Sequence, residues 1–549
     1  MSAASPGAPG AGVAKDDATP DRRWLVLAVV ALAQLMVVLD GTIVNIALPS
    51  AQQALGFSDS GRQWVVTAYA LSFGSLLLVG GRLGDMFSRK WVFVAGLVGF
   101  AIASAIGGGA GSFVVLVTAR ALQGVFGAVL APSALGTLVS VFTDPRERAR
   151  AFGVFGSVAA GGSAVGLILG GVLTEYFSWR WCLFINLVFA AIAVAGALVC
   201  IRGGRAPRRP RMDWPGALLA CTGLFAIVFG FSHAGTAGWT AALTLGSLVG
   251  GVVLLAGFIL AERHARHPLL PMRVIVDRAR GGAYVALGIS GIAIFGTFLF
   301  LTFYLQVVKG DSPLATGLLF LPMTGSILIS SNLSGTIGVG PRALIAAGML
   351  LCAGGLVLLT QVTVTSSYVS VVLPALLILG VGLGLIFAQT INTATAGLAR
   401  EDSGVASALV NTMQQVGGSI GTSALSTIAL SVAATYLIGH PSGPQAAEIA
   451  ATHGYTTAFA VSAGLLGLGF ILALVLLPSR RRLADHKDAG AATPAAPVPL
   501  PTPPAARARQ QTSEAIPVAL CSCSPVITTV AGSSSGADIT GQAFHSGSG

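Results

Sequence analysis

Two charged side chains, Asp40 and Arg120, lie well inside stretches of apolar residues that are long enough to cross a bilayer. An ionisable residue near the bilayer centre costs about 2.5–3.5 kcal/mol on insertion scales, and it usually faces a bundle interior and has a partner. Asp40 lies 8 residues before the end of its stretch at Leu48, and Arg120 lies 7 residues after the start of its stretch at Phe113. Both are therefore about 11–12 Å from the same membrane surface, where they can interact directly or through water if their helices are neighbours.

Reversible proton binding is the chemistry that this pair offers. A neighbouring cation and burial act in opposite directions on the proton affinity of a carboxylate, so the opening of a cavity would change that affinity. We predict that Asp40 carries a coupling proton and that Arg120 tunes it. A permanent ion pair that only holds two helices together is the alternative.

Other polar residues in the apolar stretches are candidates for lining a cavity, although each could equally be a hydrogen-bonding contact between helices, worth about 0.6 kcal/mol on average. These candidates are Gln34, Asn45, Gln123, Gln306, Asn411 and Gln415. The sequence offers no metal-ligand cluster, nucleotide-binding loop or Ser/His/Asp set at one depth. We therefore predict no catalytic site, no metal site and no cofactor, with a proton gradient as the energy source, so the chain is not expected to be an enzyme.

The elements that position these residues are membrane-spanning helices. Of the 549 residues 54% are hydrophobic and only 9% are charged, against roughly 25% charged in soluble domains. A bilayer core of about 30 Å needs about 20 mostly apolar residues per helix. Fourteen such stretches predict an all-α membrane protein, at 24–48, 63–82, 91–110, 113–141, 150–173, 181–201, 214–233, 240–261, 282–307, 314–332, 342–361, 368–394, 403–432 and 456–478.

The basic residues predict the orientation, because Lys and Arg collect in cytoplasmic loops. With the N-terminus inside, all 31 basic residues fall on the cytoplasmic side except Arg62, Arg120, Arg180 and Lys309. We predict a multi-pass protein of the plasma membrane with both termini in the cytoplasm. The net charge of +11 then reflects this topology and attraction to anionic lipid, and it needs no nucleic acid as a partner.

The second helix ends in Gly81-Arg82-Leu83-Gly84-Asp85, and basic residues follow at Arg89 and Lys90. This segment resembles the loop 2–3 signature of the major facilitator superfamily, in which the Asp and the basic residues latch the cytoplasmic ends of helices in one conformation. The resemblance makes Gly81, Asp85, Arg89 and Lys90 candidates for a gating loop. Met86 and Ser88 depart from the signature, and a plain basic loop is the alternative.

Three further segments resemble the fourteen-helix drug:proton antiporter branch of that superfamily. Leu39–Pro49 is similar to its first-helix signature, and Leu116–Gly124, with Arg120, to its proton-coupling motif. In the fifth helix the glycines are spaced as in the antiporter motif, although Leu167 stands where the family has proline. Glycines at i, i+4 and i+8 leave a smooth groove on one helix face, which allows close packing and sliding. We predict that they form a hinge, and plain packing is the alternative. These glycines are Gly162, Gly166, Gly170 and Gly171.

The resemblance covers most of the membrane portion and implies two six-helix bundles with pseudo-symmetric repeats and two inserted helices. The expected division is a disordered cytoplasmic N-terminus (1–21), a bundle (22–211), extra helices 7 and 8 (212–262), a cytoplasmic loop (263–281), a second bundle (282–482) and a disordered cytoplasmic tail (483–549).

The function that the resemblance implies is proton-driven efflux of a small organic compound, a drug or antibiotic, by alternating access. Self-resistance in an antibiotic producer would fit. The expected partners are a small-molecule substrate, protons and the lipid bilayer, without an obligate protein partner. Proton-coupled uptake is the first alternative, and a non-transporting membrane receptor is the second.

Overall fold

The computed structural model describes residues 20–142, 144–201, 213–265, 270, 275–395, 400–439 and 445–478. The chain divides into two units, Met1–Asp488 and Ala489–Gly549, and the second lies wholly outside the described residues. The prediction that both termini are disordered falls almost entirely outside these residues and stays a prediction.

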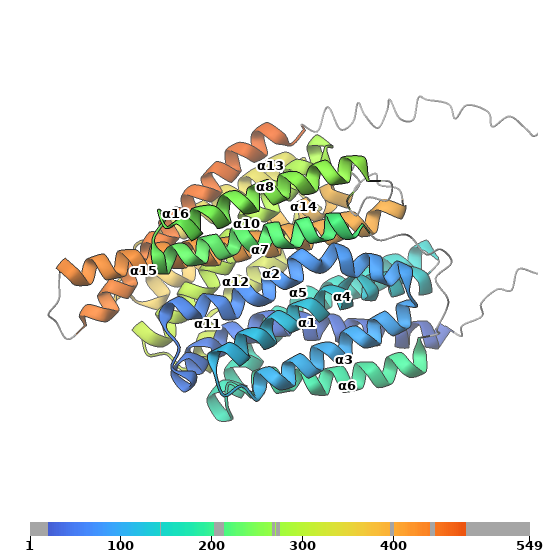
Figure 1. The fold of residues 1–549 in the computed structure, drawn as a ribbon, viewed down its shortest axis with the longest axis horizontal. Helices are drawn as coiled ribbons and strands as arrows, with labels where there is room; N and C mark the ends of the chain where they lie inside the picture. Colours follow the sequence, from blue (N-terminus) through green and yellow to red (C-terminus); the bar gives the residue numbers. More distant parts are fainter. Residues whose placement is uncertain are drawn as a thin grey trace, which may run out of the picture. The chain divides into compact units, whose positions relative to one another are not determined.

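The described residues form helices and no strand, because a backbone in lipid has to satisfy its own hydrogen bonds (Figure 1). The first eight are α1 (Pro20–Leu55), α2 (Asp59–Met86), α3 (Arg89–Gly108), α4 (Phe113–Val141), α5 (Pro145–Tyr176), α6 (Trp181–Cys200), α7 (Trp214–Ala237) and α8 (Ala242–His264). The others are α10 (Arg278–Phe303) continued by η1 (Tyr304–Val308), α11 (Pro313–Leu319) followed by α12 (Leu321–Ser334), α13 (Pro341–Leu359), η2 (Tyr368–Val372) continued by α14 (Leu373–Thr395), α15 (Arg400–Gly439) and α16 (Ala446–Leu476).

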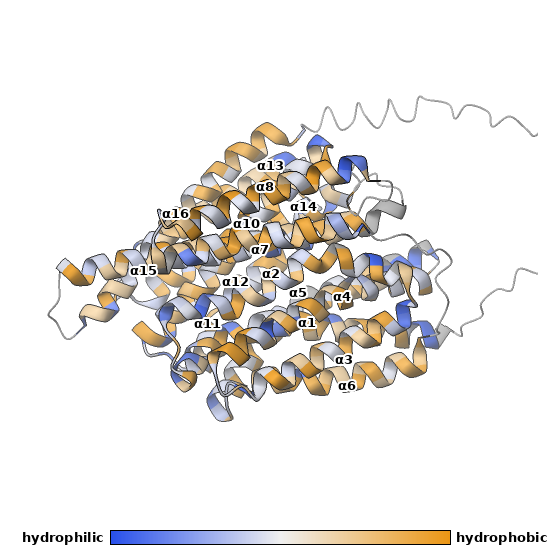
Figure 2. Cartoon of the chain, in the orientation of Figure 1, coloured by the Kyte–Doolittle hydropathy of each residue, from blue (hydrophilic) through white to orange (hydrophobic). Residues whose placement is uncertain are grey.

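Within the described residues, thirteen of these helices are long and apolar enough to cross a membrane. The helix α2 is not among the thirteen, but its 28 residues extend about 42 Å at 1.5 Å per residue, and it packs against α4 and α15. Figure 2 shows hydrophobic residues along the helices, and exposed Val199, Leu243 and Val253 suit a surface that faces lipid. The predicted all-α membrane fold is confirmed, and thirteen such helices together with α2 agree with the predicted fourteen spans.

Several helices extend beyond their predicted ends. The helix α1 continues from the predicted end at Leu48 through Pro49 to Leu55, although a proline inside a helix removes one hydrogen bond. Packing of the buried Leu48 and Ala51 compensates for that loss. The helix α16 begins at Ala446, well before the predicted residue 456, because a helix continues with polar residues once it leaves the lipid. The apolar stretch therefore marks the membrane portion and not the whole helix.

The described helices before α7 pack with one another, and so do those from α10 onward. One contact occurs in both groups. Arg22 at the start of α1 donates to the carbonyl of Val199 near the end of α6 over 2.9 Å, and Arg278 at the start of α10 donates to the carbonyl of Leu476 at the end of α16 over 3.0 Å. Each cation meets the partial negative charge of a helix C-terminus, as expected for two repeats with the same order of helices.

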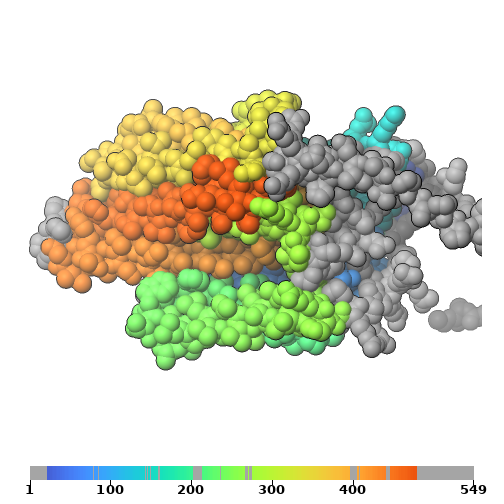
Figure 3. Space-filling model, turned by 90° about the horizontal axis from the view of Figure 1, so that it is seen from above, coloured from blue at the N-terminus to red at the C-terminus, as the bar shows by residue number. Residues whose placement is uncertain are grey.

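The helices α7 and α8 pack on each other, and Figure 3 shows them together as the green band along one side of this face. The helix α7 contacts both groups, through α2 and α15. Gln63 Nε2 donates to Ser232 Oγ over 2.9 Å, and Thr427 Oγ1 donates to the carbonyl of Phe231 over 3.1 Å. The helix α7 therefore joins the two groups along their shared side.

The loops define the two ends of the helices. We call the end that holds the α1–α2 loop (56–58) the α1–α2 end, and the end that holds the α2–α3 loop (87–88) the α2–α3 end. The loop between α10 and α11 (309–312) lies at the α1–α2 end, because successive helices alternate in direction.

Candidate functional site

Asp40 on α1 and Arg120 on α4 form a direct ion pair. Nη1 of Arg120 lies 2.5 Å from Oδ2 of Asp40, and the two side chains are 2% and 0% exposed. The equal depth inferred from the sequence therefore brings the two charges together. Because two charges removed from water lose much hydration energy, such a pair requires further hydrogen bonds around it.

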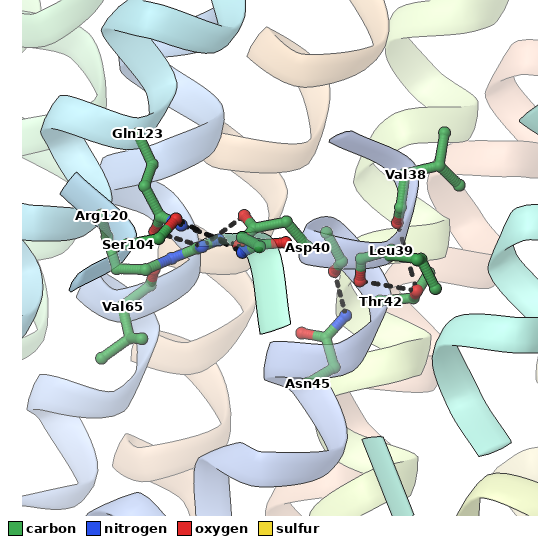
Figure 4. A network of polar contacts seen from close by, with 11 residues as sticks. Val38, Leu39, Asp40, Thr42, Asn45, Val65, Ser104, Arg120 and Gln123 are labelled. Atoms are coloured by element: carbon green, nitrogen blue, oxygen red, sulfur yellow. Dashed lines mark hydrogen bonds and ion pairs between the residues drawn. The ribbon is translucent and has the colours of Figure 1, made fainter. Parts of the chain in front are cut away.

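Two neutral amides supply these hydrogen bonds, and a serine hydroxyl holds both amides. Gln123 on α4 donates through Nε2 to Oδ1 of Asp40 over 2.8 Å, and Asn186 on α6 donates through Nδ2 to the same oxygen over 2.8 Å. Ser104 on α3 accepts from Gln123 over 2.7 Å and from Asn186 over 3.4 Å. In Figure 4 the Arg120, Gln123 and Ser104 side chains point toward Asp40. Four helices of the first group thus meet at one carboxylate.

The Arg120 guanidinium has partners besides Asp40. Nε donates to the carbonyl of Val65 over 3.2 Å, Nη1 donates to Oε1 of Gln123 over 2.8 Å, and the Tyr69 ring centroid lies 4.4 Å from Cζ. A cation over an aromatic face is stabilised by the ring quadrupole. The arginine charge therefore keeps several contacts when the carboxylate is neutral.

The chemistry that this arrangement offers is reversible protonation of a carboxylate. Asp40 is the acceptor of three hydrogen bonds, and one bound proton would neutralise it without leaving Arg120 alone. A metal site needs several His, Cys, Asp or Glu ligands together. Among the residues that the structure describes, no such group of three or more occurs.

The glycines of α5 determine how closely α1 approaches. A β-carbon on Gly162 would lie 3.1 Å from Leu35 Cδ1, and one on Gly170 would lie 2.9 Å from Ile43 Cγ1. A β-carbon on Gly166 would overlap Thr42 Oγ1. The helix that carries Asp40 therefore rests on the groove that the glycine spacing predicts, whereas the hinge role of these glycines stays a prediction.

Gly171, the fourth glycine of this set, faces the second group of helices. Its β-carbon would lie 2.5 Å from Leu314 Cα on α11. Close by, Glu175 Oε2 accepts from the Leu314 amide over 3.0 Å. The predicted cavity residue Gln306 makes another contact between the groups here, donating to the carbonyl of Ile46 over 3.0 Å. The two groups are thus in contact at the α1–α2 end.

The remaining cavity candidates lie apart from Asp40. Asn45 donates to the carbonyl of Gly41 in its own helix over 3.2 Å, as Figure 4 shows. Gln34, Asn411 and Gln415 are partly exposed on α1 and α15. Gln123 is the candidate that contacts the ion pair.

The gating-loop candidates lie at the α2–α3 end. Arg89 donates to the carbonyl of Gly136 over 3.1 Å, and Lys90 donates to the carbonyl of Leu198 over 2.8 Å. Gly81 faces Pro132 at an ordinary contact distance. The Asp85 side chain lies outside the described residues. The basic residues therefore bind carbonyls of α4 and α6, and the latch that the resemblance implies stays a prediction.

Sequence reasoning missed Ser104, Asn186 and Tyr69 as neighbours of Asp40. A depth signal was available for two of them: Ser104 lies four residues before the end of α3 at Gly108, and Asn186 lies five residues after the start of α6 at Trp181, both at the α1–α2 end. Applying the depth argument to uncharged polar residues would have placed both near Asp40.

Comparison with known proteins agrees with this architecture. The family model of the Major Facilitator Superfamily matches residues 30–422. A puromycin resistance protein of Streptomyces alboniger is 47% identical over 486 residues, which cover 87% of this chain and 96% of the relative. A tetracenomycin C resistance and export protein of Streptomyces glaucescens is 35% identical, over 74% of this chain and 76% of the relative.

Among solved structures, a bacterial homologue of the human lysosomal transporter Spinster superposes with a TM-score of 0.61 at 15% identity, covering 85% of this chain and 99% of the other. This likeness concerns the fold. The family match and the two resistance proteins extend the agreement to the sequence itself. The chain therefore belongs to the Major Facilitator Superfamily, a family of membrane transporters and not of enzymes.

Proposed function

We propose that this protein exports a small organic compound of the antibiotic class across the plasma membrane in exchange for protons, as self-resistance would require. The observation that carries the proposal is the buried Asp40 carboxylate, which is paired with Arg120 and bonded by two amides. An intramembrane ionisable residue of this kind typically belongs to an ion or proton pathway. The names of the two resistance proteins support export as the direction and antibiotics as the substrate class.

In the proposed transport cycle, the bundles 22–211 and 282–482 rock against each other around a central substrate site, with 212–262 as the inserted pair. The basic residues support an orientation with the α2–α3 end and both termini in the cytoplasm. The Gln306–Ile46 and Glu175–Leu314 contacts then close the outer side. Export requires these contacts to open while the cytoplasmic side closes.

Proton entry supplies the driving force. One pH unit across the membrane provides about 1.4 kcal/mol per proton, and 100 mV adds about 2.3 kcal/mol per charge. Protonation of Asp40 removes the negative partner of Arg120, so the two charge states differ in the contacts that hold α1 against α4 and α6. A difference in contacts between two states is what allows a bound proton to shift a conformational equilibrium.

The test uses energised inverted vesicles that contain a pH-sensitive dye, with puromycin and other antibiotics added to wild type and Asp40→Asn. We expect the drug to release protons from wild-type vesicles and not from the variant. Asp144→Asn is the matched control, because it also removes one carboxylate but leaves an asparagine that can cap the start of α5.

The outcomes separate the hypotheses. Drug-induced proton release in Asp40→Asn, at matched expression, would show that Asp40 is structural. Proton release lost equally in Asp144→Asn would show that the assay reports general damage. Drug binding without flux in wild-type vesicles would favour a receptor over an exporter.

A further inference from the structure

One of the three donors around Asp40 has a second polar atom that the network does not use. Asn186 donates through Nδ2 to Oδ1 of Asp40 over 2.8 Å. Its own Oδ1 is buried and accepts no hydrogen bond from any residue that the structure describes. Buried side-chain oxygens almost always have a donor, so an exception calls for a physical reason.

Protonation of Asp40 creates a need for an acceptor. A carboxylic acid has an O–H to donate, whereas the present partners of Asp40 all donate to it. Arg120 has no acceptor atom. Oε1 of Gln123 already accepts from Arg120 over 2.8 Å, so turning this amide would place its NH₂ group against the guanidinium. Asn186 alone among the three can offer an oxygen without breaking a contact to the arginine.

The geometry of such a turn is simple. Rotation of the Asn186 amide by about 180° about its last side-chain bond exchanges the places of Nδ2 and Oδ1, in the broad, roughly two-fold torsion that asparagine has. The oxygen would then stand where the nitrogen is now, 2.8 Å from Oδ1 of Asp40 and 3.4 Å from Oγ of Ser104. Both of these groups can donate once Asp40 carries a proton.

We infer that Asn186 is a positioning residue for the coupling proton: its amide donates to the Asp40 carboxylate and turns to accept from the Asp40 carboxylic acid. The inference rests on the proposed role of Asp40 as the proton carrier. In the step, a proton from water forms the O–H bond on Oδ1 of Asp40, and only hydrogen bonds are exchanged. In each charge state the amide then presents to Asp40 the group that this state needs, a donor to the carboxylate and an acceptor to the carboxylic acid.

Other ionisable groups that face Asp40 are Arg120 on α4, Tyr69 on α2 and Cys182 on α6. The helix α3 contributes the neutral Ser104, and α5 packs on α1 through glycines. In water a cysteine thiol, with a pKa of about 8.5, is still partly ionised at pH 8. The Asp40→Asn variant is therefore needed to assign a proton bound at the network to Asp40.

The test is infrared difference spectroscopy of the full-length protein in lipid nanodiscs on a step from about pH 8 to about pH 5, with and without ¹⁵N-asparagine. We expect a new carboxylic C=O band together with an asparagine amide band that changes with the isotope label. Asp40→Asn should lack both bands. Asn186→Thr should keep the carboxylic band and lose the amide band.

Two substitutions of Asn186, to threonine and to valine, test the same inference by transport activity. Threonine can both donate and accept a hydrogen bond, and valine has the same shape but can do neither. We expect drug-induced proton release within about threefold of wild type in Asn186→Thr and on the order of tenfold slower in Asn186→Val. An Asp40-dependent carboxylic band without an Asn186-dependent amide band would overturn this inference and leave the proposed function standing. Absence of the Asp40-dependent band in wild type would overturn both.

Discussion

Gly171→Ala should open the α1–α2 end of the transporter. The new β-carbon would lie 2.5 Å from Leu314 Cα and 2.9 Å from the Pro313 carbonyl oxygen. Ordinary contacts between carbon atoms are about 3.5–4.0 Å, so the overlap is about 1 Å. Because both neighbours are backbone atoms, no side-chain rotation relieves it, and α5 and α11 have to separate.

This overlap determines how far Gly171→Ala shifts the equilibrium between the closed and the open α1–α2 end. Inserting a methyl group into a packed contact costs about 1–3 kcal/mol, and this cost falls only on the state in which the two helices touch. A difference of 1–3 kcal/mol shifts a two-state equilibrium by about 5- to 150-fold. Alanine also gains about 1 kcal/mol of helix propensity over glycine, but it does so in both states. The control Gly161→Ala isolates that gain, because its β-carbon would meet nothing within 4 Å.

The assay is a spin-label distance measurement in nanodiscs, with labels at the exposed positions Gln53 on α1 and Lys309 after η1, in a cysteine-free background. We expect the ratio of the longer-distance to the shorter-distance population to rise about 5- to 150-fold in Gly171→Ala and to stay at the wild-type level in Gly161→Ala. Gly317→Ala approaches the same contact from α11, where the Leu167 carbonyl lies against it, and should act in the same direction. An unchanged distribution in a well-folded Gly171→Ala protein would refute the argument that this contact closes the α1–α2 end.

Three further predictions concern stability, each measured by thermal unfolding in detergent. Arg120→Leu alone should destabilise the folded protein by about 3–5 kcal/mol at neutral pH, because it leaves a buried carboxylate unpaired. The double variant Arg120→Leu/Asp40→Asn should recover most of that loss. Additive effects of the two substitutions would contradict the ion pair. Gly166→Ala should destabilise the folded protein by about 1–3 kcal/mol, because the new β-carbon overlaps α1. Gly153→Ala should not destabilise it, because its β-carbon would meet nothing within 4 Å. Equal effects of the two substitutions would contradict the packing of α5 against α1. Burial raises the pKa of Asp311 above 3.8, against the lowering effect of Lys309. The folded state therefore favours the protonated form of Asp311, and ionisation of this side chain destabilises the fold as the pH rises. Asp311→Asn should raise the melting temperature at pH 7 and leave it unchanged below about pH 4. The opposite pattern would contradict the burial of Asp311.

The membrane fold could be predicted from the sequence because lipid imposes one requirement on every span. Each stretch needs about 20 apolar residues, whatever its neighbours are. Helix ends could not be predicted as well, since α1 passes Pro49 and reaches Leu55 through packing that only the folded protein has. Which helices touch also depends on packing between distant parts of the chain, so neither the place of α7 against α2 and α15 nor its contacts could be foreseen.

The site was predictable where a charge signalled it. Asp40 and Arg120 stand out because a charge in lipid is costly, and equal depth was enough to pair them. The neutral Ser104 and Asn186 lie at a similar depth but carry no charge that singles them out, because single polar residues are common in membrane helices and most bond locally, as Asn45 does. Gln123 was foreseen as a cavity residue, but its place beside Asp40 depends on a rotamer and on α3, which the pattern of one helix does not contain.

With Asp40 as the proposed proton carrier, the packing of α1 offers a route by which a charge change at one residue would move an entire bundle. Asp40 faces α4 and α6, while its neighbours Leu39 and Ile43 press against the α5 glycines. These contacts leave no free space, and close-packed interiors transmit small shifts instead of absorbing them. A shift of α1 on protonation therefore reaches Gly170 and the adjacent Gly171, which touches the second group at the α1–α2 end. In the proposed cycle, both the proton and the closure would bias α1 between two arrangements, which is the physical condition for coupling.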